Sequence, residues 1–150
     1  MRLKSSDGKI FEVPKAVALL SVIIKTVVED LRSENPIPLP SVSSDILEKI
    51  IKYCTYHVDH PIRTIGKVDP WDAEFVNVDL PTLFQIGWAA QSLDIATLLD
   101  LVCRTIAGEI TACKTHEKVR EMLNIENDLT PEDVEAIKRQ APWAFDNETL

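Results

Sequence analysis

Apolar residues recur at helical spacing in two consecutive blocks between Pro81 and Cys113. Only four charged side chains interrupt these 33 residues. The spacing favours helix over strand, and two neighbouring helices this apolar cannot both face water. The pattern therefore predicts a buried helical pair joined at Ser92 to Asp94, where either polar residue can cap the second helix. The apolar positions are Leu83, Phe84, Ile86, Trp88, Ala89 and Ala90, then Ile95, Leu98, Leu99, Val102, Cys103, Ile106 and Ile110.

The amino-terminal part of the chain predicts a small sheet and two helices. Extended segments at Arg2–Ser5 and Ile10–Val13 flank an Asp-Gly pair, which is typical of a β-hairpin because both residues adopt positive φ at low cost. Alternating prolines in residues 35–40 exclude a helix and predict an extended edge segment. Helices are expected to start at Ser21 and Ser43. Their apolar faces are Ile24, Val27, Val28 and Leu31, and Ile46, Leu47, Ile50, Ile51 and Cys54.

Two further helices are predicted after Cys113. Thr115 caps one that runs to Leu123, and Thr130 starts another that reaches about Gln140. Each spans about ten residues, below the ~12–15 at which isolated helices become marginally stable in water. In one interpretation, the two helices fold back on the core. In the other, their apolar positions form an uncovered face of the kind that marks a partner site. The pattern does not decide between the two. These positions are Val119, Met122, Leu123, Ile125, Leu129, Val134, Ile137 and Trp143.

Charge and cysteine content indicate which cellular environment and which classes of partner are expected. The chain carries 16 Lys and Arg against 24 Asp and Glu, a net charge of −8, with a pI of about 4.8. An acidic protein is repelled by phosphate backbones and anionic membranes, so neither nucleic acid nor membrane is expected as a partner. Asp94 splits the longest apolar stretch below the ~20 residues that span a bilayer, and the first residues do not have the pattern of a signal peptide. An odd cysteine count fits a reducing compartment, so we expect a soluble, intracellular protein.

Motifs for catalysis are scarce. The four glycines form neither a phosphate-binding loop nor a nucleophile turn. The strongest metal candidate is the set Cys54, His57 and His60, because thiolate and imidazole suit zinc. No fourth ligand is apparent, and a histidine near the end of a helix also interacts favourably with the helix dipole. We therefore expect no metal, cofactor or catalytic residue, and keep a small metal-dependent enzyme as a remote alternative.

Several short motifs follow one another along nearly the whole chain. They are Ser5-Ser6-Asp7-Gly8 with Ile10-Phe11-Glu12-Val13, Pro36-Ile37-Pro38-Leu39-Pro40, Pro70-Trp71-Asp72-Ala73-Glu74-Phe75, Val78-Asp79, Thr82-Leu83-Phe84, Leu93-Asp94-Ile95 with Leu98-Leu99-Asp100, Asn124-Ile125-Glu126-Asn127-Asp128-Leu129-Thr130, and Trp143. In order and spacing over about 140 positions, these motifs resemble the S-phase-kinase-associated adaptors of cullin-based (SCF-type) ubiquitin ligases, a family related to elongin C.

The resemblance implies an α+β fold, with a BTB/POZ domain in residues 1–113 and a helical extension in residues 114–150. It also implies a non-catalytic adaptor that bridges a cullin to F-box substrate receptors in the cytoplasm and nucleus, for protein degradation. The F-box site would comprise Val119, Met122, Leu123, Ile125, Leu129, Val134, Ile137 and Trp143. The cullin site would comprise Ile37, Leu39, Ala90, Gln91 and Ser92.

The chain departs from the family pattern where the cullin site is expected. Ser92 stands where the family usually has a tyrosine, and Trp88 where it prefers a smaller aliphatic residue. The alternative function is therefore a divergent paralogue that scaffolds F-box proteins without a cullin. Pro131 matches a proline that some lineages hydroxylate and glycosylate. An uncovered apolar face would also allow a homodimer in the absence of a partner, and the choice of F-box proteins and substrates is not encoded in this pattern.

Overall fold

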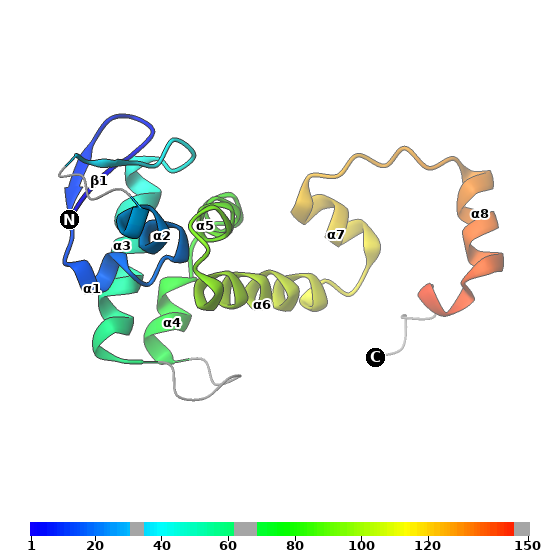
Figure 1. Cartoon of the computed structure of the whole chain (residues 1–150). Coiled ribbons are helices and arrows are strands. Elements are labelled where there is room, and N and C mark those ends of the chain that lie inside the picture. Colours follow the sequence, from blue (N-terminus) through cyan, green and yellow to red (C-terminus); the bar gives the residue numbers. More distant parts are fainter. Residues whose placement is uncertain (31–34, 62–68, 146–150) are drawn as a thin grey trace. The chain divides into compact units, whose positions relative to one another are not determined.

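The computed structural model describes residues 1–30, 35–61 and 69–145. The chain forms two compact units, Met1–Ile106 and Ala107–Leu150, whose boundary falls inside the long helix α6 (Ala96–Ala112). The first unit contains a three-stranded sheet and helices α1 to α5, and the second contains α7 and α8 (Figure 1). Among the described residues, no helix is long and apolar enough to cross a bilayer. The assignment of separate roles to residues 1–113 and 114–150 stays a prediction.

The first two strands form the predicted hairpin. β1 (Arg2–Lys4) pairs antiparallel with β2 (Ile10–Glu12). In the turn, the Gly8 N–H donates a hydrogen bond of 3.0 Å to the Ser5 carbonyl. Gly8 has a φ of 87°, which glycine adopts without steric cost. The prediction from the Asp-Gly pair is thus confirmed, with the positive φ at the glycine.

β3 (Ile37–Pro38) is one of the two edge strands of the sheet. It runs parallel to β1, in the strand order β2-β1-β3. The Leu39 N–H extends the pairing with a bond of 2.7 Å to the Lys4 carbonyl. Proline lacks an N–H and is tolerated on an edge strand, so the predicted extended edge segment is confirmed.

Helix α3 (Ser44–Asp59) begins where the sequence predicts, but its cap differs. Ser43 occupies the N-cap position, yet its side chain makes no capping hydrogen bond. Instead, the Asp7 carboxylate in the distant hairpin turn accepts bonds from the Ser44 N–H at 2.9 Å and from the Ser44 hydroxyl at 2.6 Å. A carboxylate at a helix N-terminus satisfies free N–H groups and complements the helix dipole. The cap therefore also ties the hairpin to α3.

The short helix α1 (Lys15–Ala18) precedes α2 (Val22–Asp30). Ser21 lies between them and links the start of α2 to Leu93, which is distant in sequence. The Ser21 hydroxyl accepts a hydrogen bond of 3.1 Å from the Ile24 N–H and donates one to the Leu93 carbonyl. Ser21 thus starts α2, as predicted, and fixes it to the turn that follows α5. Leu31, predicted to complete the apolar face of α2, lies outside the described residues.

Helices α5 (Leu80–Ser92) and α6 provide much of the predicted core. The expectation that Ser92 or Asp94 caps α6 is wrong, because Ser92 lies inside α5 and α6 begins only at Ala96. Asp94 instead has a φ of 50° and ends α5. This left-handed conformation lets the Ile95 N–H reach the Ala90 carbonyl at 2.9 Å. The bond satisfies one of the free carbonyl groups at the carboxyl-terminal end of α5. The buried core residues of the pair are Leu83, Ile86, Ala89, Ala90, Leu98, Leu101 and Val102.

One apolar strip of α5 faces outward, contrary to the prediction of a fully buried pair. Trp88 is 69% exposed and Phe84 is 38% exposed. They are four residues apart, as are Trp88 and Ser92, so all three lie along one side of the helix. The exposed Cys103 of α6 is a further exception to the predicted core. Helical spacing identified the apolar positions of α5, but the neighbouring elements of the fold cover only some of these side chains.

The second unit contains the two predicted carboxyl-terminal helices. The Thr115 hydroxyl caps α7 (His116–Leu123) by accepting a bond from the Lys118 N–H. Thr130 caps α8 (Pro131–Gln140), and Asp133 completes a reciprocal capping box with it. These boundaries confirm the predicted ones. A short 3-10 helix, Pro142–Ala144, follows α8.

We predict that replacing Asp7 by alanine destabilises the fold at neutral pH. Hydrogen bonds from the Ser44 side chain, then from Ser5, lower the pKa of Asp7 from 3.8 to about 2. A carboxyl group whose pKa is lower in the folded state adds stability above its unfolded pKa and loses it as the pH falls through the folded pKa. The melting temperature of Asp7→Ala should therefore lie below that of the wild type at pH 7 and converge with it near pH 2. A gap that persists unchanged at pH 2 would contradict this assignment.

Candidate functional site

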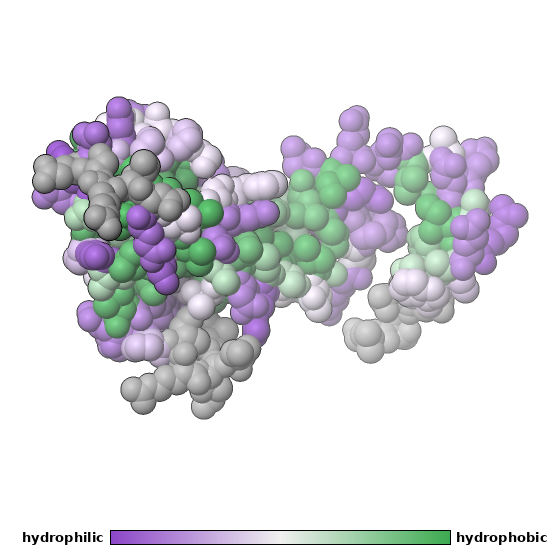
Figure 2. Space-filling view, viewed as in Figure 1, coloured by the Kyte–Doolittle hydropathy of each residue, from purple (hydrophilic) through white to green (hydrophobic). Residues whose placement is uncertain are grey.

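The second unit exposes an apolar face. Neither α7 nor α8 has a buried residue, and Figure 2 shows apolar side chains at the surface among polar ones in this unit. Among the predicted F-box residues, Val119, Met122, Leu123 and Val134 are half-buried. The remaining four are exposed, namely Ile125, Leu129, Ile137 and Trp143.

Trp143 is the most exposed large apolar residue of this face, at 75%. It lies in the 3-10 turn after α8, closed by a bond of 3.0 Å from the Phe145 N–H to the Pro142 carbonyl. The Phe145 ring contacts the His116 ring at 5.7 Å between centroids, and the Lys138 ammonium lies 5.7 Å from its centroid. Phe145 thus holds the turn against both helices of the unit and leaves the indole in solvent.

The five predicted cullin residues differ in what they present at the surface. Leu39 and Ala90 are buried in the core of the first unit, and Ile37 packs partly against the same core. Gln91 and Ser92 are exposed at the end of α5. Only these two, with part of Ile37, present side chains that a partner could contact.

Two of the three candidate metal ligands, His57 and His60, have other partners. His57 Nε2 lies 2.7 Å from Asp72 Oδ1, and His57 Nδ1 lies 3.1 Å from the His60 carbonyl oxygen. The His60 ring bonds instead to the Tyr56 carbonyl. Burial raises the pKa of the Cys54 thiol to about 12, so it is not a ready thiolate ligand. No cluster suited to a metal ion occurs among the described residues.

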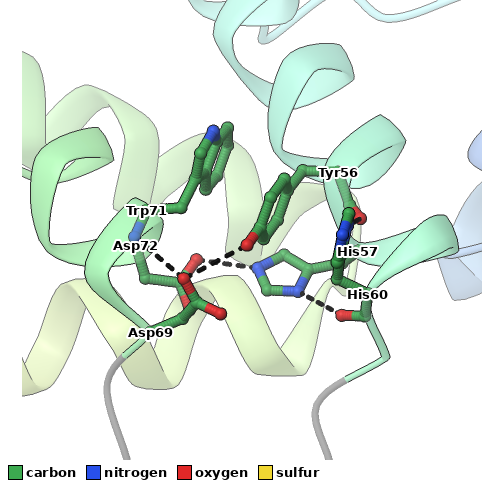
Figure 3. Close-up of polar contacts among 6 residues, drawn as sticks. All are labelled: Tyr56, His57, His60, Asp69, Trp71 and Asp72. Atoms are coloured by element: carbon green, nitrogen blue, oxygen red, sulfur yellow. Dashed lines mark hydrogen bonds and ion pairs between the residues drawn. The ribbon is translucent and has the colours of Figure 1, made fainter.

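The contact between His57 and Asp72 joins α3 to α4 (Pro70–Phe75). Both side chains are buried. Because a carbonyl only accepts, Nδ1 donates to His60, and one proton between Nε2 and the Asp72 carboxyl group completes the second bond. His57 near the end of α3 was expected to interact with the helix dipole, but the structure gives it this specific partner. Figure 3 shows the ring held between the two acceptors.

Stacked rings surround this pair. Tyr56 stacks on Trp71 at 4.1 Å between centroids, with an angle of 3° between the rings, and on His60 at 4.4 Å. Trp71 in turn stacks on Phe75 at 5.4 Å. The Tyr56 hydroxyl donates to Asp69, whose carboxylate also caps α4 by accepting from the Trp71 N–H. Sequence analysis missed this cluster, although aromatic residues four apart in α4 were a visible signal.

The comparisons with known proteins cover almost the whole chain. The model described as "Skp1 family, tetramerisation domain" matches residues 1–59, and the one described as "Skp1 family, dimerisation domain" matches residues 96–144. The SCF ubiquitin ligase complex protein SKP1a of Dictyostelium discoideum is 44% identical, covering 97% of this chain and 96% of that protein. SKP1-like protein 1A of Arabidopsis thaliana is 45% identical, with 96% of each chain covered. The chain belongs to the Skp1 family.

Membership of the Skp1 family confirms the resemblance and the α+β POZ fold. A fungal relative, the E3 ubiquitin ligase complex SCF subunit sconC of Talaromyces marneffei, is 42% identical over 96% of both chains. The sheet of β1 to β3 and the whole of α3 lie within the first matched segment, and α7 and α8 lie within the second. The predicted contact residues and the cytoplasmic and nuclear location stay predictions.

We predict that Asp72→Ala lowers the free energy of unfolding by about 3 kcal/mol, because it leaves a buried imidazole without its partner. Urea unfolding followed by circular dichroism measures this change. Glu74→Ala is the matched control, since Glu74 is an exposed acid on the same helix, and should change stability by less than about 0.5 kcal/mol.

A double variant tests whether the pair itself is responsible. His57→Leu/Asp72→Leu should lose less stability than the sum of the two single changes, because both polar groups leave the interior together. Strictly additive losses would show that the two residues act independently.

Proposed function

We propose that this protein is the adaptor subunit of an SCF-type ubiquitin ligase, binding a cullin at one surface and an F-box substrate receptor at another. The observation that carries the proposal is the full-length similarity, since relatives named as SCF subunits match 96–97% of this chain. We infer that the protein catalyses no reaction itself. It holds a substrate receptor near the ubiquitin-charged enzyme, which raises the effective concentration of the substrate there.

The F-box site is proposed on α7, α8 and the turn that contains Trp143. The support is physical: eight apolar side chains in this unit are half-buried or exposed, and exposed apolar patches on soluble domains usually mark protein contacts. Helices of eight and ten residues are also too short to be stable alone. Packing against the helices of a receptor would therefore both cover the face and stabilise the unit.

The cullin site is proposed at the end of α5, where Gln91 and Ser92 are exposed. A serine offers little of the ~150–250 Å2 that an aromatic anchor buries. Trp88 lies one turn earlier on the same side of α5 and is 69% exposed, so it can supply the missing aromatic contact. A scaffold that binds F-box proteins without a cullin is the second candidate, and the exposed serine is the observation that favours it.

Replacing Trp143 by alanine tests the F-box site. Truncation of a large aromatic anchor often costs 2 kcal/mol or more, about thirtyfold in affinity. We therefore expect Trp143→Ala to weaken binding of an F-box segment by at least about tenfold in a calorimetric titration, with little change in melting temperature. Trp88→Ala removes an equally exposed indole from the first unit and should leave F-box affinity unchanged. A large loss of melting temperature in Trp143→Ala would instead assign Trp143 to the interior of the folded chain.

Replacing Ser92 by tyrosine tests the cullin site. The added ring should strengthen binding to a cullin amino-terminal domain, while F-box affinity stays constant because Ser92 is not among the proposed F-box contacts and sites that share no partner residues usually act independently. Ala16→Tyr, at an exposed position of α1, controls for a general effect of an added aromatic ring. Weaker binding by Trp88→Ala would show that Trp88 already provides the anchor. Absence of cullin binding by every variant would favour the cullin-free scaffold.

A further inference from the structure

A groove lies between α3 and α4 in the first unit, at a distance in sequence from both proposed partner sites. Its volume is about 230 Å3. Apolar rings and an aliphatic side chain form part of its lining, and charged side chains complete it. The lining residues are Lys49, Lys52, Trp71, Glu74, Phe75 and Val78.

The aromatic wall of the groove is held in place before any ligand binds. Trp71 stacks on Tyr56 and on Phe75, and its backbone N–H is bonded to Asp69 at 2.8 Å. The buried bond of 2.7 Å between His57 and Asp72 fixes α4 against α3. A prearranged surface loses little conformational entropy on binding.

The groove carries positive charge on a strongly acidic protein. Lys49 and Lys52 are three residues apart on α3 and so lie on the same side of the helix. Among the described residues, neither ammonium group is within ion-pair distance of a carboxylate. Asp79 is the acid that Lys49 influences, but its two oxygens accept bonds from the N–H and hydroxyl of Thr82. Glu74 is the single acid in the lining, beside two lysines on a chain of net charge −8.

A third donor is provided by the indole of Trp71. No described residue accepts a hydrogen bond from its ring N–H. Figure 3 shows the ring nitrogen on the side of Trp71 away from the Asp69 and Asp72 carboxylates. Two ammonium groups and an N–H beside aromatic rings match a ligand that combines carboxylates with an apolar side chain.

We propose that this groove binds an acidic peptide segment of a partner protein, with an aromatic side chain of the segment against Trp71 and Phe75 and its carboxylates on Lys49 and Lys52. The site does not depend on the adaptor role, because its residues lie outside the proposed F-box and cullin contacts. It would give the protein a third binding surface, on the first unit.

The test is a titration of the 15N-labelled full chain with the peptide acetyl-Glu-Glu-Phe-Glu-Glu-amide, followed by NMR. Saturable shifts are expected at the Trp71 indole N–H and at the backbone of Lys52 and Phe75. Lys49→Gln/Lys52→Gln should weaken binding by about tenfold, because two charge pairs are lost. The control Lys15→Gln/Lys25→Gln removes two exposed lysines elsewhere and should stay within about twofold of the wild type.

Two altered peptides complete the test without changing the protein. Lysine in place of each glutamate should abolish the shifts, and serine in place of the phenylalanine should weaken binding. Shifts confined to other surfaces, equal binding by both double variants, or equal binding of the acidic and basic peptides would each overturn the proposal. F-box and cullin titrations have separate outcomes, so the failure of one proposal leaves the other measurable.

Discussion

The close approach of α5 to α6 is the packing constraint on which the first unit depends. A Cβ at position 87 would lie 3.1 Å from Cγ1 of Val102, so Gly87 permits a distance that a larger residue would oppose. Ala89 and Ala90, on the same helix, are buried, and small residues let helices pack without a gap. The turn between the helices then holds α2 through Ser21. One tight contact thereby positions elements from distant parts of the chain.

This packing has a direct consequence for the exposed surface. Because α5 packs Leu83, Ile86, Ala89 and Ala90 against the core, its apolar residues Phe84 and Trp88 lie on the other side. A tryptophan that is 69% exposed loses hydrophobic stabilisation in the free protein. A partner that covered the strip would relieve that unfavourable exposure, which is why Trp88 enters the proposed cullin contact.

A second, polar constraint acts near the carboxyl-terminal end of α3. The buried His57 and Asp72 satisfy each other across a stretch of chain in which residues 62–68 are not described. Buried polar groups are costly unless they are paired, so the short α4 has essentially one favourable position on α3. The rings of Tyr56, Trp71 and Phe75 stack beside that bond. The cluster thereby holds α4 rigidly against α3.

Local sequence signals were sufficient for several parts of the fold and the candidate site. The Asp-Gly hairpin, the extended segment at the prolines of β3, the helix start at Thr130 and the apolar positions of α7 and α8 all follow from residues within a few positions of one another. Such features depend on backbone preferences and helical periodicity, which are properties of short segments. The family resemblance was likewise carried by the order of short motifs.

The tertiary structure alone decided three other features. Asp7 caps a helix 37 residues away, His57 bonds Asp72 of a different helix, and Trp88 faces solvent within a helix whose pattern predicts core. In each case the outcome depends on which groups from distant segments come together. Periodicity shows that a helix has an apolar face, but only the neighbours packed around that helix determine how much of the face is covered.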